Sequence, residues 1–154
     1  MYAVDLKQEG KTYNEIVNLL YKKRNMTRVF LVPDDLTYLV KGGRAPAKVK
    51  TIANIFRLRP ILGTKKGKLR VRGVLYGKTR TADKFVNFLK SKIDSNKQYR
   101  IMVAHSNCQE KGQYFLDKLI SENSNIVKHN LLELGGALGA HAGPNSIVVG
   151  LQEI

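Results

Sequence analysis

The chain has 154 residues, of which 43% are apolar and 8% aromatic, and Cys108 is its single cysteine. A chain of this length and composition can build one hydrophobic core, so we expect one domain over residues 1–154. Lysine and arginine number 27 against 12 acidic residues, which gives a formal net charge of +15. The lone cysteine excludes an intrachain disulfide and a thiolate metal site, and the charge favours an anionic partner.

The apolar runs are too short to span a bilayer. Residues 29–32 are the clearest run, and the longer uncharged stretch near the C-terminus is interrupted by glycines and Pro144. The N-terminus lacks a basic region followed by a sustained apolar stretch, so no secretory signal is expected. These features predict a cytoplasmic location.

The N-terminal part of the chain predicts a helix and then a strand. Thr12 and Glu15 have the spacing of a capping box, and apolar residues follow at helical intervals, which predicts a helix over residues 12–25. Residues 29–32 are apolar β-strand formers that end at Pro33, so they predict a short strand.

Two further helices are expected before the middle of the chain. Asp34 is placed to cap a short helix, which the glycine pair 42–43 ends. Pro46 suits the first turn of the next helix, and apolar residues at helical spacing continue it to residue 56.

A β-hairpin is expected in the middle of the chain. Residues 58–63 and 68–76 read as extended segments around a short turn in which Gly67 takes a positive φ. In the second strand, cations alternate with apolar residues or glycine, so one face of the strand is basic. These cations are Lys68, Arg70 and Arg72.

The rest of the chain alternates between helix and strand. We expect a helix over 82–93, a strand over 99–104 that we read as buried, a helix through 115–120 capped by Asn107 with Glu110, and strands over 125–132 and 146–151. A hairpin followed by strand-helix-strand units predicts the α/β class, with a mixed β-sheet covered by helices.

Three segments combine glycine or proline with a charged or ionisable residue in ways that packing alone does not require. They are residues 35–44 (DLTYLVKGGR), 58–62 (LRPIL) and 139–144 (GAHAGP). In this order, with Gly67 in a hairpin and the basic segment 78–80 before a helix, they resemble the C-terminal domain of DegV-family proteins. The resemblance covers nearly the whole chain and implies the fold of that domain.

The resemblance also implies a function. DegV-type proteins are carriers that bury a long-chain fatty acid between two domains and present its carboxylate to a fatty-acid kinase, without carrying out chemistry themselves. In that family the N-terminal domain supplies hydroxyl residues that hold the carboxylate. This chain resembles only the C-terminal domain, so the N-terminal DegV domain is absent from it and those hydroxyl residues have no counterparts here.

The resemblance places the head-group end of the ligand near Arg44 and His141. Arg44 follows two glycines where a helix gives way to a loop, so its guanidinium reaches either helix-end carbonyls or a ligand carboxylate. His141 lies in a glycine-rich segment, read here as a turn, and a structural role stays open for both residues. The expected acyl wall, which the sequence does not separate from ordinary core, is Ile52, Ile55, Phe56, Ile61, Leu62, Phe85 and Leu89.

The remaining ionisable residues are read as structural. His105 ends a strand and His129 alternates within one, and the three histidines lack metal-ligand spacing, so neither a metal nor a cofactor is expected. His105 and Cys108 have no orienting acid beside them, which argues against a thiol nucleophile. A small hydrolase or transferase therefore lacks its catalytic set.

The cationic strand is expected to face a partner. Lys68, Arg70 and Arg72 would attract an acidic surface of the kinase or, transiently, an anionic membrane. The net charge leaves a basic nucleic-acid-binding domain as the alternative function. That alternative lacks an aromatic stacking platform and a recognition motif, so no nucleic acid is expected as a partner.

Overall fold

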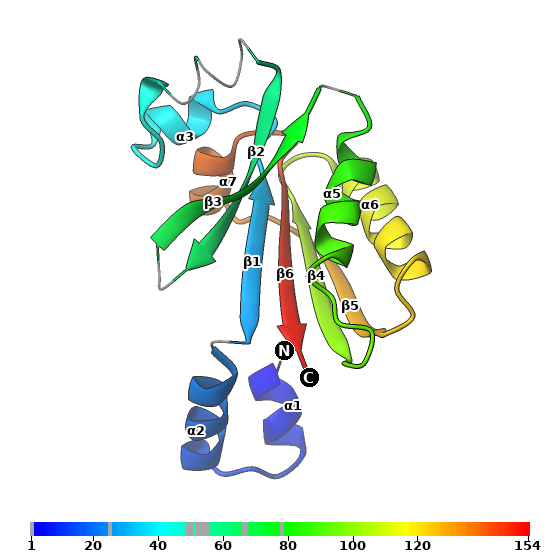
Figure 1. Ribbon diagram of the computed structural model, residues 1–154. Coiled ribbons are helices and arrows are strands. Elements are labelled where there is room, and N and C mark those ends of the chain that lie inside the picture. Colours follow the sequence, from blue (N-terminus) through cyan, green and yellow to red (C-terminus); the bar gives the residue numbers. More distant parts are fainter. Residues whose placement is uncertain (1, 25, 49–50, 52–55, 66–67, 78) are drawn as a thin grey trace.

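The fold is built on one mixed β-sheet of six strands in the order β3-β2-β1-β6-β4-β5 (Figure 1). The computed structural model describes residues 2–24, 26–48, 51, 56–65, 68–77 and 79–154. The strands are β1 Thr27–Val32, β2 Leu58–Lys65, β3 Lys68–Tyr76, β4 Tyr99–His105, β5 Ile126–Glu133 and β6 Ile147–Glu153. β4 and β5 pair in parallel and the other neighbours pair antiparallel, which confirms the predicted α/β class.

The helices divide between the two faces and the two ends of the sheet (Figure 1). They are α1 Tyr2–Gln8, α2 Tyr13–Arg24, α3 Thr37–Lys41, α5 Thr81–Lys90, α6 Gln109–Ser121 and α7 Gly136–Ala142. α5 and α6 pack side by side on one face, α3 and α7 pack together at one end of the other face, and α1 and α2 lie together beyond the opposite end. Among the described residues, no helix combines the length and the apolar character that crossing a bilayer requires.

The main core lies between the sheet and the pair α5 and α6. Alternate residues of β1, β4 and β6 point toward these helices, as the two-residue period of a strand requires. Phe85 of α5 stacks on Phe115 of α6 with ring centroids 5.1 Å apart, and Phe30 of β1 meets Phe88 edge to face at 5.4 Å. Burying each such side chain contributes about 1.5–3 kcal/mol, so this layer provides most of the stability.

The N-terminal capping box forms as predicted. The backbone N–H and the hydroxyl of Thr12 donate to the Glu15 carboxylate at 2.8 and 2.7 Å, and the Glu15 N–H donates back to the hydroxyl at 3.4 Å. The helix α2 that follows matches the expected range to within a residue at each end. The helix α1, at residues 2–8, was not anticipated because seven residues make about two turns, which is too short a window to show helical periodicity.

Two other predicted caps are wrong. Asp34 does not cap α3, whose N-cap residue is Leu36; its carboxylate instead accepts from Arg59 at 2.5 Å. Asn107 does not cap α6, whose N-cap residue is Cys108; it adopts a positive φ of 50° in the preceding turn. At the start of α3 the Thr37 N–H donates to the neighbouring Asp35 at 2.8 Å while Arg59 engages Asp34, and Asn107 is held in a tight turn.

One other segment differs from its predicted structure, and another lies partly outside the described residues. The glycine-rich segment around His141 is not a turn, because residues 136–142 form the helix α7. Its last turn ends at Gly143, whose φ of 79° suits a residue without a side chain. Of the helix expected over 46–56, residues 47–48 and 51 are helical and Phe56 is in a turn, while Ile52 and Ile55 lie outside the described residues.

Candidate functional site

The second face of the sheet is only partly covered. Strand pairing places Leu31 opposite Val148 and Val148 opposite Ala104, and the next row joins Val29, Gly150 and Met102. These six residues are half-buried, whereas their neighbours along the strands point into the main core. We call this surface the open face; it consists of Val29, Leu31, Met102, Ala104, Val148 and Gly150.

The open face is apolar, and the residues in its middle have small side chains or none. Gly150 has no side chain, and a Cβ placed there would meet only the Cβ and the carbonyl of Met102, at 3.8 and 3.9 Å. Ala104 is nearly as small, so the middle of the open face carries its smallest side chains. A surface of this kind offers dispersion and hydrophobic contact to a hydrocarbon chain but no hydrogen bonds.

One end of the open face meets a close contact between α3 and α7. A Cβ on Gly42 would lie 2.1 Å from Nδ1 of His141, so the imidazole occupies the space that a side chain at Gly42 would need. A Cβ on Gly143 would lie 2.5 Å from the Tyr38 ring. Two glycines therefore let the two short helices approach, each receiving a ring from the other.

The two predicted head-group residues meet at this contact. Nη1 of Arg44 donates to the Gly42 carbonyl at 2.8 Å, and His141 packs on the same glycine. Arg44 is exposed and His141 is half-buried, so both groups reach solvent beside one backbone segment. The structure thus brings together two motifs that are far apart in the sequence.

A small apolar cluster joins this polar end to the open face. Leu36 and Leu39 of the α3 region pack on Leu62 of β2, and Leu31 packs against the same cluster. Leu31 belongs to both the cluster and the open face, while Leu36, Leu39 and Leu62 are buried, so the cluster joins the open face to α3 by packing and not by exposed surface. The arrangement has an apolar floor and, at one end, a guanidinium and an imidazole.

The residues expected to form an acyl wall do not share one surface. Ile61, Phe85 and Leu89 lie in the main core and are at most 2% exposed, so a ligand would reach them only by displacing side chains. Leu62 lies in the small cluster on the other side of the sheet, and Phe56 is 65% exposed. Contact of these residues with a ligand stays a prediction.

The open face was missed because its residues look like core residues. The strand at Met102 and Ala104 was read as buried, since Met, Val and Ala are all apolar and show no apolar-polar alternation. A weak signal was present in Gly150, because glycine inside a strand often marks a place where another group approaches closely.

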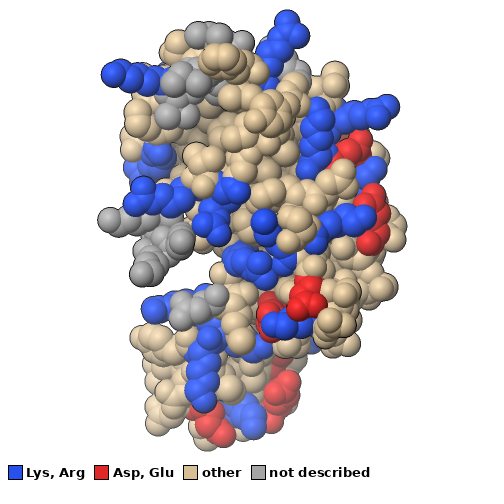
Figure 2. Space-filling view, viewed as in Figure 1, with Lys and Arg blue, Asp and Glu red and all other residues tan. Residues whose placement is uncertain are grey.

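The cationic strand β3 lies at the edge of the sheet. Arg70 and Arg72 are exposed, while the side chain of Lys68 lies outside the described part of the chain. Val71 is also exposed, at 58%, so both faces of this part of the strand meet solvent. Figure 2 shows lysine and arginine side chains spread over the viewed face of the molecule, with acidic side chains in fewer places.

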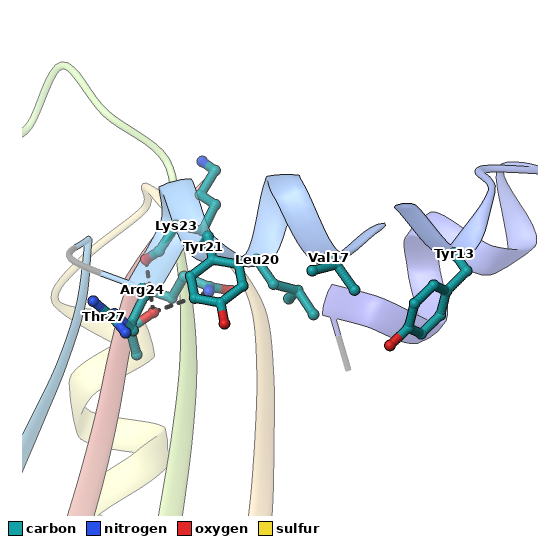
Figure 3. Close-up of a pocket in the computed structure, with 8 residues that line it drawn as sticks. Tyr13, Val17, Leu20, Tyr21, Lys23, Arg24 and Thr27 are labelled. Atoms are coloured by element: carbon teal, nitrogen blue, oxygen red, sulfur yellow. Dashed lines mark hydrogen bonds between the residues drawn. The ribbon is translucent and has the colours of Figure 1, made fainter. Parts of the chain in front are cut away.

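An apolar hollow lies along α2 (Figure 3). α2 is at the end of the sheet opposite to α3 and α7 (Figure 1). The hollow has a volume of about 670 Å³, and Tyr13, Val17, Leu20 and Tyr21 provide its apolar side. Lys23, Arg24, Thr27 and Gln152 complete the lining. None of the residues of α2, all of which are described, is buried, so this hollow is a surface groove and not an enclosed cavity.

The pair His105 and Cys108 does not form an activated nucleophile. The Cys108 N–H donates to Nδ1 of His105 at 3.4 Å, and the thiol contacts the carbonyl of Ser146 at 3.8 Å. Burial raises the pKa of the Cys108 thiol, which keeps it protonated near neutral pH. His105 is buried and ends β4, in agreement with the structural role predicted for it.

Comparison with known proteins finds relatives that match nearly the whole chain. A family model described as "Uncharacterised protein, DegV family" matches residues 1–153. A DegV domain-containing protein of Streptococcus pyogenes serotype M6 is 29% identical over 153 residues, which are 97% of this chain and 52% of that protein. One from Clostridium perfringens is 27% identical over 152 residues, covering 98% and 53%. The chain therefore spans about half the length of the curated relatives it matches.

Solved structures share the fold. A DegV-family protein from Thermus thermophilus, described as fatty-acid binding, has a TM-score of 0.84 at 18% identity and covers 99% of this chain and 54% of its own. A fatty-acid-binding DegV-family protein from Streptococcus agalactiae has a TM-score of 0.79 at 24% identity, covering 98% and 53%. One from Eubacterium eligens, loaded with heptadecanoic acid, has a TM-score of 0.79 at 19% identity, covering 97% and 54%. Since the family model matches nearly the whole chain, this protein belongs to the DegV family.

Proposed function

We propose that this chain is the lipid-binding half of a fatty-acid carrier and carries out no chemistry itself. The observation that carries this proposal is the half-buried apolar open face, which Leu31 and its cluster connect to α3, beside the contact where Arg44 and His141 both touch Gly42. The fatty acids bound to DegV-family proteins of the same fold support it. In this proposal the hydrocarbon chain lies on the open face and its carboxylate lies at the Arg44 end.

The open face accounts for only one side of a ligand. Burial of each methylene is worth about 0.8 kcal/mol, and a chain resting on an open sheet keeps its other side in water. We therefore propose that this chain corresponds to the C-terminal domain of longer relatives and that a second domain closes over the open face. Relatives of about twice this length have room for such a domain.

Arg44 and His141 are suited to a carboxylate. The guanidinium is always charged and has five N–H donors, of which the contact with the Gly42 carbonyl uses one. The imidazole beside the same glycine adds a ring N–H that can donate to the second carboxylate oxygen. Together they fix the ligand's polar end, while the open face tolerates different hydrocarbon chains.

Delivery of the ligand is the role that we propose for the basic surface. Arg70 and Arg72, with Lys68 beside them in sequence, lie on an edge strand of a chain whose net charge is +15. Such a field accelerates encounter with an acidic protein surface and with anionic membranes. The proposed partners in the cytoplasm are a fatty-acid kinase and, transiently, an anionic membrane.

The position of the ligand can be tested with heptadecanoic acid and methyl NMR. We expect it to shift the methyl signals of Met102 and Ala104, and we expect the substitution Gly150→Leu to abolish these shifts by placing a large side chain in the middle of the open face. Val71→Leu, on the exposed edge strand, is the matched control and leaves them unchanged. Binding that is unaffected by Gly150→Leu would contradict the proposal.

Nucleic-acid binding is the second candidate, and the net charge of +15 favours it. Binding carried by lysine and arginine contacts to phosphates weakens steeply as salt rises. A titration of duplex and single-stranded DNA at two salt concentrations tests it: a steep salt dependence supports this function, and weak binding at both concentrations rules against it.

A further inference from the structure

Arg100 is a buried arginine with unused hydrogen-bond donors. It lies on β4 opposite Gln152, one row beyond the open face and on the same side of the sheet, and it is 7% exposed. Its Nη2 donates to the carboxylate of Asp5 in α1. Its Nε and Nη1 atoms are buried, and among the described residues they have no hydrogen-bond partner.

Such an arrangement is costly for arginine in particular. A guanidinium does not lose its proton in proteins, so burial cannot be relieved by a shift to the neutral form. Leaving a buried donor without an acceptor carries the full desolvation penalty of that donor, which is larger for a charged group. Arg100 is therefore a site at which an additional acceptor is strongly favoured.

The surroundings of Arg100 contain more positive than negative charge. Lys128 on the neighbouring strand β5 donates to the same Asp5 carboxylate at 3.1 Å, so one acid serves two cations. Tyr2 of α1 lies against the guanidinium, with its ring centroid 5.8 Å from Cζ. The nearby carboxylate of Glu153 is engaged by a different residue, Lys97, at 2.9 Å, and does not complete the site.

The cover over Arg100 is slight. α1 has seven residues, packs chiefly against α2 and buries Leu6. It reaches the sheet at Arg100 through two side chains, those of Tyr2 and Asp5. Displacing α1 therefore exposes the guanidinium without disturbing the main core.

We propose that Arg100 and Lys128 form an oxyanion site, for a carboxylate or phosphate group, which Asp5 occupies from within the chain and which an external oxyanion takes over when α1 is displaced. This site lies beyond the far end of the open face from Arg44 and His141. It does not depend on the proposed fatty-acid binding, because its evidence is the two buried Arg100 donors without a partner among the described residues and the carboxylate that Arg100 shares with Lys128.

The test uses the full chain, with inorganic phosphate and acetate as separate probes. Binding is followed by NMR through the side-chain Nε–H signal of Arg100 and the amide signals of α1. The substitution Asp5→Asn removes the internal competitor, so it should tighten binding of at least one probe by about tenfold or more. Glu153→Gln changes the net charge equally and leaves Arg100 untouched, so it should not tighten binding.

Removing the cations should have the opposite effect. In the Asp5→Asn background, Arg100→Gln should abolish anion binding, and Lys128→Gln should weaken it by about tenfold. Lys128 is exposed, so its substitution reports on the site even if Arg100→Gln impairs folding. Tighter binding of phosphate identifies a phosphate site, and tighter binding of acetate identifies a carboxylate site. Equal binding by Asp5→Asn and Glu153→Gln, or no shift at Arg100 with either probe, would overturn the proposal.

Discussion

The contact between Gly42 and His141 makes a quantitative prediction for Gly42→Ala. The φ of Gly42 is −77°, which alanine adopts readily, so the backbone itself does not oppose the change. The new Cβ would lie 2.1 Å from Nδ1 and 2.9 Å from Cε1 of His141, and 3.1 Å from the Tyr38 carbonyl. Overpacking of this kind costs about 1–3 kcal/mol, against a gain of about 0.4–1 kcal/mol from replacing a glycine. We expect a net loss of about 1–2 kcal/mol.

A double-mutant cycle in urea identifies the cause of that loss. Gly42→Ala should lower the unfolding midpoint with an unchanged m-value, and in the His141→Ala background it should become nearly neutral because the opposing ring is gone. Gly136→Ala is the control: apart from its chain neighbours and the backbone of its own helix, no atom of the described residues lies within 4 Å of the added Cβ, so it should be neutral or stabilising. An equal loss with and without the imidazole would refute the close contact. The same Gly42→Ala variant should weaken fatty-acid binding, since it moves His141.

Three other predictions follow from the structure. Gly143→Ala combines a φ of 79° with a Cβ 2.5 Å from a tyrosine ring, so it should destabilise the fold by about 2–5 kcal/mol in urea denaturation, and a loss below 1 kcal/mol would contradict this. The pKa of Asp5 is lowered from 3.8, first by its hydrogen bond from Lys128 and then by the neighbouring guanidinium. A carboxyl group whose pKa is lowered in the folded state stabilises the fold at pH values above its unfolded pKa, and this stability is lost as pH falls through its folded pKa. Asp5→Asn should therefore lower the free energy of unfolding at pH 7 and flatten its pH dependence below 3.8. Curves of unfolding free energy against pH that run parallel for the two proteins would count against this. Charge reversal at Lys68, Arg70 and Arg72 should slow ligand exchange with the kinase at low salt and leave acyl occupancy intact. An unchanged exchange rate would contradict the proposed docking role.

Features set by neighbouring residues were predictable from the sequence. The capping box at Thr12 and Glu15 needs only a three-residue spacing, so it forms wherever a helix begins there. The hairpin and the later strand-helix-strand units were likewise visible in turn residues and in periodicity. Their order along the chain was enough to predict a mixed sheet, and the order of three short motifs was enough to indicate the family.

Features that depend on distant partners were not predictable. Asp34 has the chemistry of a helix cap, but Arg59 from the next strand provides a charged donor that a neighbouring backbone N–H does not match. Ile61 and Leu62 are adjacent in β2, so the two-residue period of a strand places them on opposite faces, but the sequence does not show which helices cover each face. Apolar character shows that a residue avoids water and does not show which element covers it.

The candidate site was likewise predictable in part. Arg44 and His141 were indicated mainly by the resemblance to the family, and the glycines beside them marked backbone that tolerates close approach. Their meeting at Gly42 arises only when α3 and α7 pack together, and the open face arises only because α5 and α6 cover the opposite side. Local patterns act over a few residues through backbone hydrogen bonds and dihedral preferences. The pairing of faces is decided by the burial of the whole sheet, to which every strand and helix contributes.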